Sequence, residues 1–207
     1  MKLDKKDRKI LYEIDLNARI GTSQLGKKTG LSQENAHYRL KRLEKHGMIK
    51  DYMILLNFSM IGYTGYGIYA CFQNVDKKKI FEIYEQLKEH PNIYWIAEFG
   101  GKFDIAFAVM ASDVSHFNEI YYDIQTDYQE FMKDMTISIR AELMQFPRNY
   151  LLDKKAISQK QPRFGKYFQL EHIDKLDKEI LSSLSNNARK PLLQASKDLK
   201  KPPSTIS

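Results

Sequence analysis

Residues 29–49 read TGLSQENAHYRLKRLEKHGMI, and this stretch decides the fold of the N-terminal part of the chain. Gly30 can adopt the left-handed backbone conformation that ends a helix sharply. Ser32 can cap a following helix, and Glu34 suits the positive first turn of that helix. The pattern predicts a helix over 33–46 with an inward apolar face made of Ala36, Leu40 and Leu43.

The residues on either side complete a three-helix pattern. A helix over 5–16 has Ile10, Leu11 and Ile14 on one face, and a shorter helix over 22–29 has Leu25 inward. The following residues, MIKDYMILLNF at 48–58, predict two short strands that form a wing. Three helices with a tight glycine turn before the last predict a winged helix-turn-helix, whose third helix enters the DNA major groove.

The outward face of the predicted third helix is polar. Amide and guanidinium groups can bond base edges, while lysine and tyrosine side chains and a helix N-terminus can hold phosphates. A solvated helix face has a similar composition, so the glycine turn carries more of the prediction than the polar face does. The candidate DNA-binding residues are Ser32, Gln33, Glu34, Asn35, His37, Tyr38, Lys41 and Arg42.

This N-terminal block resembles the Lrp/AsnC family of transcription regulators. The family opens with Leu-Asp-x-x-Asp-x-x-Ile-Leu, which LDKKDRKIL at 3–11 matches, and it has Gly-Leu-Ser at the turn, as at 30–32. The family's Arg-Ile-Lys-Arg-Leu-Glu matches RLKRLE at 39–44, with Leu40 in place of Ile. Asn35 stands where the family usually has Thr. The resemblance implies a transcription regulator that binds double-stranded DNA.

The middle of the chain predicts a ferredoxin-like βαββαβ domain, which gives an α+β fold for the whole. Strands are expected over 66–74, 93–99, 103–111 and 134–144, and helices over 76–89 and 113–128. The first of these helices is expected to face the core with Ile80, Phe81, Ile83, Tyr84 and Leu87. The second is expected to face the core with Val114, Phe117, Ile120, Tyr121 and Ile124.

The strand at 103–110 has apolar residues on both faces, although two helices can cover only one face of a sheet. This pattern predicts a homodimer, or a higher homo-oligomer, that buries the second face. The block also resembles the family's effector-sensing domain. That resemblance implies that Gly101 and Asp104, in the turn GGKFD, help to bind a small effector such as an amino acid. A glycine and an aspartate are also ordinary residues of a hairpin turn.

The distribution of charge separates the ends of the chain from its middle. Residues 1–62 carry 13 Lys/Arg against 7 Asp/Glu, residues 63–145 carry 7 against 13, and residues 146–207 carry 13 against 6. This order favours contact between a polyanion and the ends only. The single Cys71, the spacing of the five histidines and the lack of a long apolar run predict a cytoplasmic, non-membrane protein without a metal, a cofactor or catalytic residues.

The N-terminal block recurs near the C-terminus. When residues 3–37 are aligned with 173–207, ten of the 35 pairs are identical, and both copies contain Asn-Ala-Arg, at 17–19 and 187–189. Lys200 stands in the place of Gly30, and Pro202 in the place of Ser32. The second copy is readable to the start of its third helix, which leads to the hypothesis that the chain is part of a longer tandem protein.

The sequence therefore predicts a regulator with four segments: a winged helix-turn-helix at 1–62, a sensing and dimerisation domain at 63–147, a linker at 148–172 and a truncated second helix-turn-helix at 173–207. Two alternatives stay open at this point. One is an enzyme like the sirohaem decarboxylases, which resemble this family in both domains. The other is an oligomeric sensor of small molecules that does not bind DNA.

Overall fold

The first three helices begin and end where their caps require. The computed structural model describes residues 1–152, 162–165, 170–185 and 187–206. Helix α1 (Lys5–Leu16) starts at a reciprocal cap, in which Asp4 and Asp7 each accept the backbone N–H of the other, at 2.7 and 3.2 Å. Helix α2 (Thr22–Thr29) ends at Gly30 with φ +66°, and helix α3 (Gln33–Lys45) starts at the Ser32 cap. The predicted helix bounds are confirmed to within one residue.

These helices share one buried core. The apolar residues predicted for the inward faces pack together with Ile20 and are almost fully buried, except Leu11, which packs against this core and is partly buried. Burial of this kind stabilises each isoleucine or leucine side chain by about 1.5–3 kcal/mol relative to its exposed state. The core residues are Ile10, Ile14, Ile20, Leu25, Ala36, Leu40 and Leu43.

The prediction of two wing strands at 48–58 is wrong. Residues 51–57 form neither helix nor strand, and the 3-10 turn η1 (Phe58–Ile61) follows them. Their polar groups bond to other segments of the chain. The Tyr52 carbonyl accepts the Ala188 N–H at 2.7 Å, and the Asn57 side chain accepts the Gly165 N–H at 3.0 Å. Residues 51–57 therefore bond to segments far away in the sequence, and they do not pair with each other as a hairpin.

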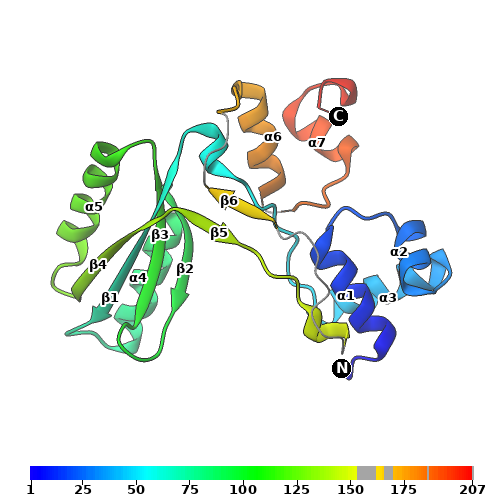
Figure 1. Cartoon of the computed structure of the whole chain (residues 1–207), viewed down its shortest axis with the longest axis horizontal. Coiled ribbons are helices and arrows are strands. Elements are labelled where there is room, and N and C mark those ends of the chain that lie inside the picture. Colours follow the sequence, from blue (N-terminus) through cyan, green and yellow to red (C-terminus); the bar gives the residue numbers. More distant parts are fainter. Residues whose placement is uncertain (153–161, 166–169, 186, 207) are drawn as a thin grey trace. The chain divides into compact units, whose positions relative to one another are not determined.

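The middle of the chain forms the predicted ferredoxin-like arrangement (Figure 1). Its four strands lie in the order β2-β3-β1-β4, and every neighbouring pair is antiparallel. Two helices pack on one face of this sheet, over a core that includes Ile68, Phe107 and Ile120. The elements are β1 (Thr64–Phe72), α4 (Lys77–Glu89), β2 (Ile93–Glu98), β3 (Ile105–Ala111), α5 (Val114–Tyr128) and β4 (Met132–Arg140).

Two helix residues predicted to face inward are exposed. Phe81 is 65% exposed, because it lies about 100° around the helix from Ile80 and outside the stripe that buries Ile83 and Leu87. Val114 is 68% exposed, because it is the first residue of α5, directly after the Asp113 cap. The other inward residues of the two helices are buried or partly buried, and all of them except Ile80 belong to the core or pack against it.

The strand predicted over 134–144 divides in two. β4 ends at Arg140, and a short strand β5 (Glu142–Met144) pairs with β6 (Arg163–Gly165) instead of extending the main sheet. Gly165 has φ +83°, and a Cβ atom there would lie 2.5 Å from the carbonyl oxygen of Ala141. A glycine is therefore required where the two short strands meet.

The C-terminal repeat reproduces the local structure of the first two helices. Helix α6 (Lys175–Ser185) starts at a reciprocal Asp174–Asp177 cap, with distances of 2.8 and 3.0 Å. Helix α7 (Leu192–Leu199) follows, and Lys200 takes the left-handed conformation of Gly30, with φ +52°. A 3-10 turn, η3 (Pro203–Thr205), ends the described part of the repeat.

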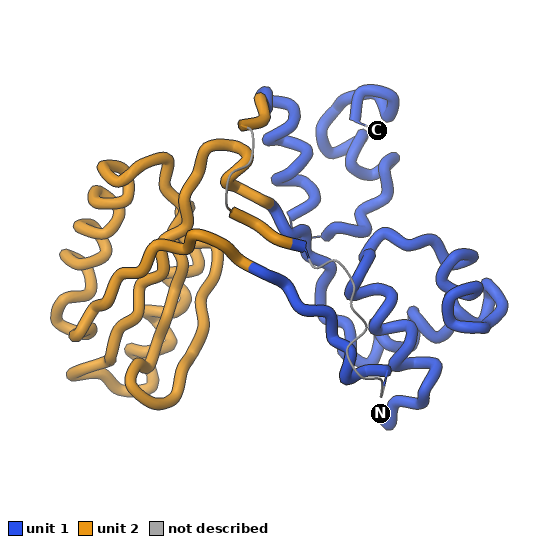
Figure 2. Tube along the Cα trace, in the orientation of Figure 1, with its two compact units in different colours: residues 1–56, 144–162, 173–207 blue, residues 57–143, 163–172 orange. Residues whose placement is uncertain are grey.

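The described chain forms two compact units (Figure 2). Unit 1 comprises 1–56, 144–162 and 173–207, and unit 2 comprises 57–143 and 163–172. The turn η2 (Asn149–Leu152) packs on α1 within unit 1, beside an ion pair between Arg148 and Asp15. The four segments expected from the sequence remain a prediction about domains. Among the described helices, none combines the length and apolar character that crossing a membrane requires.

Candidate nucleic-acid interface

Helix α3 presents a polar face to solvent. Gln33, Glu34, Asn35 and His37 are exposed, and Tyr38 is 64% exposed. The opposite face is buried in the core that α1, α2 and α3 share, and we call these three helices the first head, or simply the head. The exposed residues follow the N-terminus of the helix, where free backbone N–H groups and the helix dipole favour an anion such as phosphate.

Ser32 fixes the start of this helix. Its hydroxyl oxygen accepts the N–H of Asn35 at 3.2 Å, so this side chain is used as a cap. The sequence analysis included Ser32 among the candidate DNA-binding residues. In the structure, its hydroxyl positions the first turn of α3, which carries several of those residues.

The two basic residues predicted next to each other on this face have different surroundings. Lys41 is exposed, and its ammonium group pairs with Glu44 one turn later at 2.8 Å. Arg42 turns toward the core of the head, where it bonds both carboxylate oxygens of Asp7, at 2.8 and 2.9 Å. Asp7 is only 1% exposed. The Arg42 guanidinium is thus committed to a buried charge, whereas the Lys41 ammonium group lies on the surface.

Arg39 is a structural residue that the prediction of contacts did not identify. Its guanidinium bonds Asp4 at 2.6 Å and Asp7 at 2.9 Å, which ties α3 to the cap of α1. The backbone N–H of Asp7 and the guanidinium of Arg39 lower the pKa of Asp4 to about 2. The sequence contains all four charged residues, two aspartates at the start of the first helix and two arginines on the third helix. Only the structure pairs them.

Lys6 holds the turn that precedes α3. Its ammonium group donates to the carbonyl oxygens of Thr29 at 2.6 Å and Gly30 at 3.0 Å. These carbonyls end α2, where a cation offsets the negative end of the helix dipole. Sequence analysis did not identify this contact, because a lysine on α1 looks like any solvated charge.

The candidate effector turn is built as a hairpin. Gly101 has φ +114°, and the Asp104 carboxylate accepts the backbone N–H of Phe72 at 2.8 Å. Asp104 also donates its own N–H to the carbonyl of Ala70. The turn is exposed at Gly101, and Asp104 ties it to the end of strand β1.

Comparison with known proteins places this geometry in a family. Residues 3–50 match the model of winged helix-turn-helix DNA-binding domains. An HTH-type transcriptional regulator of Pyrococcus abyssi is 31% identical over 123 residues, which are 58% of this chain and 81% of that protein. The structure of an AsnC family transcriptional regulator from Agrobacterium tumefaciens aligns with a TM-score of 0.62 at 19% identity, over 70% of this chain and 95% of that one. The chain belongs to the Lrp/AsnC family of transcription regulators.

A second solved structure supports the same fold. A transcriptional regulator of Neisseria meningitidis, solved as a complex with L-Met, aligns with a TM-score of 0.59 at 23% identity. The alignment covers 67% of this chain and 89% of that one. At this level of identity the likeness shows the helix-turn-helix and four-stranded sheet of the Lrp/AsnC fold.

The sheet of this Lrp/AsnC regulator has an aromatic face on the side away from its helices. Ala106 and Ala108 of β3 are fully buried there, and the larger Tyr69 and Trp95 pair opposite them. Trp95 is still 39% exposed, and the Arg140 guanidinium lies 4.8 Å from its ring centroid. Apolar side chains remain accessible on this face within a single chain.

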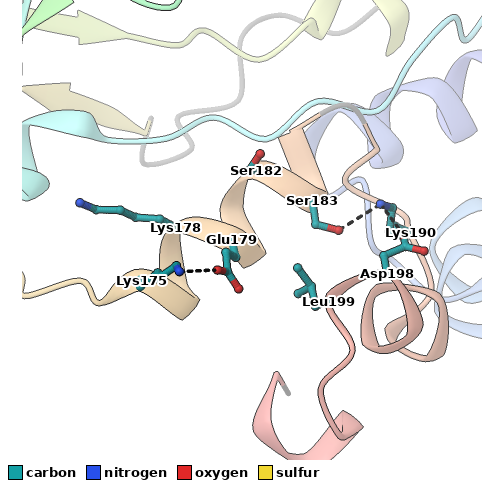
Figure 3. Close-up of a pocket in the computed structure, with 8 residues that line it drawn as sticks. All are labelled: Lys175, Lys178, Glu179, Ser182, Ser183, Lys190, Asp198 and Leu199. Carbon is teal, nitrogen blue, oxygen red and sulfur yellow. Dashed lines mark hydrogen bonds and ion pairs between the residues drawn. The ribbon is translucent and has the colours of Figure 1, made fainter.

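A pocket lies between α6 and α7 of the C-terminal repeat (Figure 3). Most of its charged groups pair with each other, since Lys190 bonds Ser183 and Asp198 at 3.0 Å each and Lys175 pairs with Glu179 at 4.0 Å. We assign no ligand to it. The lining residues are Lys175, Lys178, Glu179, Ser182, Ser183, Lys190, Asp198 and Leu199.

Proposed function

We propose that this Lrp/AsnC regulator contacts double-stranded DNA through the outward face of α3. The observation that carries the proposal is the exposure of Gln33, His37 and Tyr38 next to the capped N-terminus of a helix whose other face is buried. Amide, imidazole and hydroxyl groups can bond base edges and phosphates from a helix laid in the major groove. Lys41 adds a cation at the same surface.

We infer two different roles for the eight candidate DNA-binding residues. We propose direct contacts for Gln33, Glu34, Asn35, His37, Tyr38 and Lys41, and a positioning role for Ser32 and Arg42, whose side chains bond within the head. The distribution of charge supports contact with DNA by the N-terminal segment, because the segment 1–62 is basic and the segment 63–145 is acidic. Acidic surface favours an assembly and sensing role away from DNA.

We propose that the aromatic face of the sheet is the dimer interface. The support is the accessible apolar surface around Trp95 on the side that neither α4 nor α5 covers. Enrichment in aromatic residues and arginine is typical of the centre of a protein interface. A dimer would also supply two α3 helices, as the reading of two half-sites requires.

We propose that the GGKFD turn takes part in binding a small amino acid and that this binding changes affinity for DNA. The support is the exposed turn at Gly101 beside a carboxylate, and the L-Met bound in the Neisseria relative. Calorimetric titration of the full chain with the common amino acids tests it. Binding of one of them, lost in Asp104→Asn, is the expected result. Equal binding by wild type and variant would remove this turn from the site.

We propose that the chain acts in the cytoplasm and catalyses no reaction. The support is that its relatives are named as transcriptional regulators. The two alternatives make distinct predictions. Porphyrin absorbance in the purified protein would favour the decarboxylase-like enzyme, and very weak DNA binding that does not change with salt would favour the sensor.

The DNA contact is tested by fluorescence anisotropy with mixed-sequence duplex DNA at several salt concentrations. Lys41→Ala should weaken binding and lower the slope of log affinity against log salt by about one. The matched control is Lys88→Ala, because Lys88 forms the same type of ion pair, with Glu85, on α4 of the other unit. An equal loss in both variants would contradict a contact through α3.

A further inference from the structure

The two Asn-Ala-Arg loops of the chain contact each other within unit 1. The Arg19 guanidinium donates to the carbonyl oxygens of Ala188 at 2.7 Å and of Lys190 at 3.4 Å. The Arg189 guanidinium donates in the same way to the carbonyl oxygens of Ala18 at 2.5 Å and of Ile20 at 3.3 Å. Each loop gives the other the same donor and the same acceptors, which is the pattern of a two-fold interface.

Each loop is shaped in the same way for this contact. The Asn17 side chain accepts the N–H of Arg19 at 2.9 Å, and the Asn187 side chain accepts the N–H of Arg189 at 3.0 Å. These local turns fix the backbone whose carbonyls receive the opposite guanidinium. The asparagine shapes the loop, the alanine presents the acceptor and the arginine donates. This division explains why all three residues occur in both repeats.

Tyr52, in the segment after α3, also contacts the Asn-Ala-Arg loop of the C-terminal repeat. Ala188 is buried, and its N–H donates to the carbonyl of Tyr52 at 2.7 Å. The Arg189 guanidinium lies 5.3 Å from the centroid of the Tyr52 ring, whose hydroxyl donates to Glu44 at the end of α3. The C-terminal repeat thus bonds both the loop before α2 and the segment after α3.

The contact leaves the DNA-binding face of α3 open. His37 and Lys41 are exposed, and Tyr38 is 64% exposed, while the two loops are in contact. Docking of the second repeat is therefore compatible with binding of DNA by the first. It also adds positive charge beside the first three helices, since the repeat at 173–207 carries 7 Lys/Arg against 4 Asp/Glu.

We propose that the Asn-Ala-Arg loop is a self-complementary docking surface and that its partner is the C-terminal repeat of the same chain. The pairing holds the second repeat against the first head and keeps α3 free. It depends neither on the sheet dimer nor on an effector.

The test is amide hydrogen exchange at Ala188 in the full chain, followed by NMR. This N–H bonds Tyr52, so it reports docking directly. Arg19→Ala, in the other repeat, should speed exchange at Ala188 about tenfold, the effect of losing a charged hydrogen bond. Arg189→Ala should do the same. The double variant should add less than the two effects combined, because both arginines close one interface.

Two references keep the result specific. Lys197→Ala removes an exposed charge from the same repeat and should leave exchange at Ala188 unchanged. Amides of Leu40 and Leu43 should stay protected in every variant, because they belong to the core of the first head. Unchanged exchange in both arginine variants would overturn the proposal. Protection of Ala188 that disappears on dilution would also overturn it, because the partner would then be a second copy of the chain.

Discussion

Asp7 carries a charge that is almost fully buried, and two guanidinium groups neutralise it. Arg39 and Arg42 approach it from successive turns of α3 at 2.8–2.9 Å. A buried carboxylate without such partners would lose several kcal/mol of hydration, so the two arginines fix α3 on α1. Adjacent basic residues look alike in a sequence. Their contacts differ, because the Lys41 side chain lies on the surface, whereas the Arg42 side chain bonds the buried Asp7 and stabilises the fold.

Arg42→Ala should therefore destabilise the head, while Lys41→Ala should not. Because Arg39 still neutralises part of the Asp7 charge, the expected loss is about 2 kcal/mol in the free energy of unfolding. Urea unfolding followed by circular dichroism measures it. Lys41→Ala should stay within about 0.5 kcal/mol of wild type, as surface changes usually do. Equal stability of the two variants would contradict the inward role of Arg42.

Stability of the head should fall in acid through Asp4. The folded pKa of Asp4 is lowered to about 2, below its ordinary value of 3.8, so the charged form stabilises the fold. This contribution is complete above the unfolded pKa and is lost as the pH falls from 3.8 toward 2. Asp4→Asn should lose that part of the pH dependence in thermal unfolding measured across this range. Parallel curves for variant and wild type would show that Asp4 contributes nothing.

At the scale of elements, the two repeats end their second helix in the same backbone conformation with different residues. Gly30 and Lys200 both have positive φ, at +66° and +52°. A residue with a Cβ atom pays about 1 kcal/mol for this conformation. Lys200→Gly should recover most of that energy. Slower amide exchange in α7 would show it, whereas faster exchange would mean that the lysine side chain contributes more than the strain costs.

The sequence predicted most elements because their signals are local. The cap at Ser32 and the turn at Gly30 placed the end of the second helix and the start of the third at the observed residues. The wing was predicted wrongly because strands need a partner, and the partners of residues 51–57 come from more than a hundred residues away. Separation in sequence also hid the ion pairs with Asp4 and Asp7, whose partners on α3 lie 32 or 35 residues away, and the contact between the two Asn-Ala-Arg loops.

At the scale of the whole molecule, the proposed dimer depends on the aromatic face of the sheet. Trp95→Glu places a charge where a partner would bury apolar surface, so the variant should be monomeric at micromolar concentration by light scattering. Phe81→Glu is the control, because Phe81 is also exposed but lies on α4 at the opposite face of the sheet. A monomeric wild type, or dissociation by both variants, would contradict the interface.

The central proposal is that α3 of the first head reads DNA sequence. Selection from a random duplex library with the full chain tests it most directly. The wild type should enrich a site with two related half-sites, and a variant with alanine at Gln33, His37 and Tyr38 should enrich none while keeping its fold and its oligomeric state. Absence of enrichment by the folded wild type, or enrichment of the same site by that variant, would contradict the proposal.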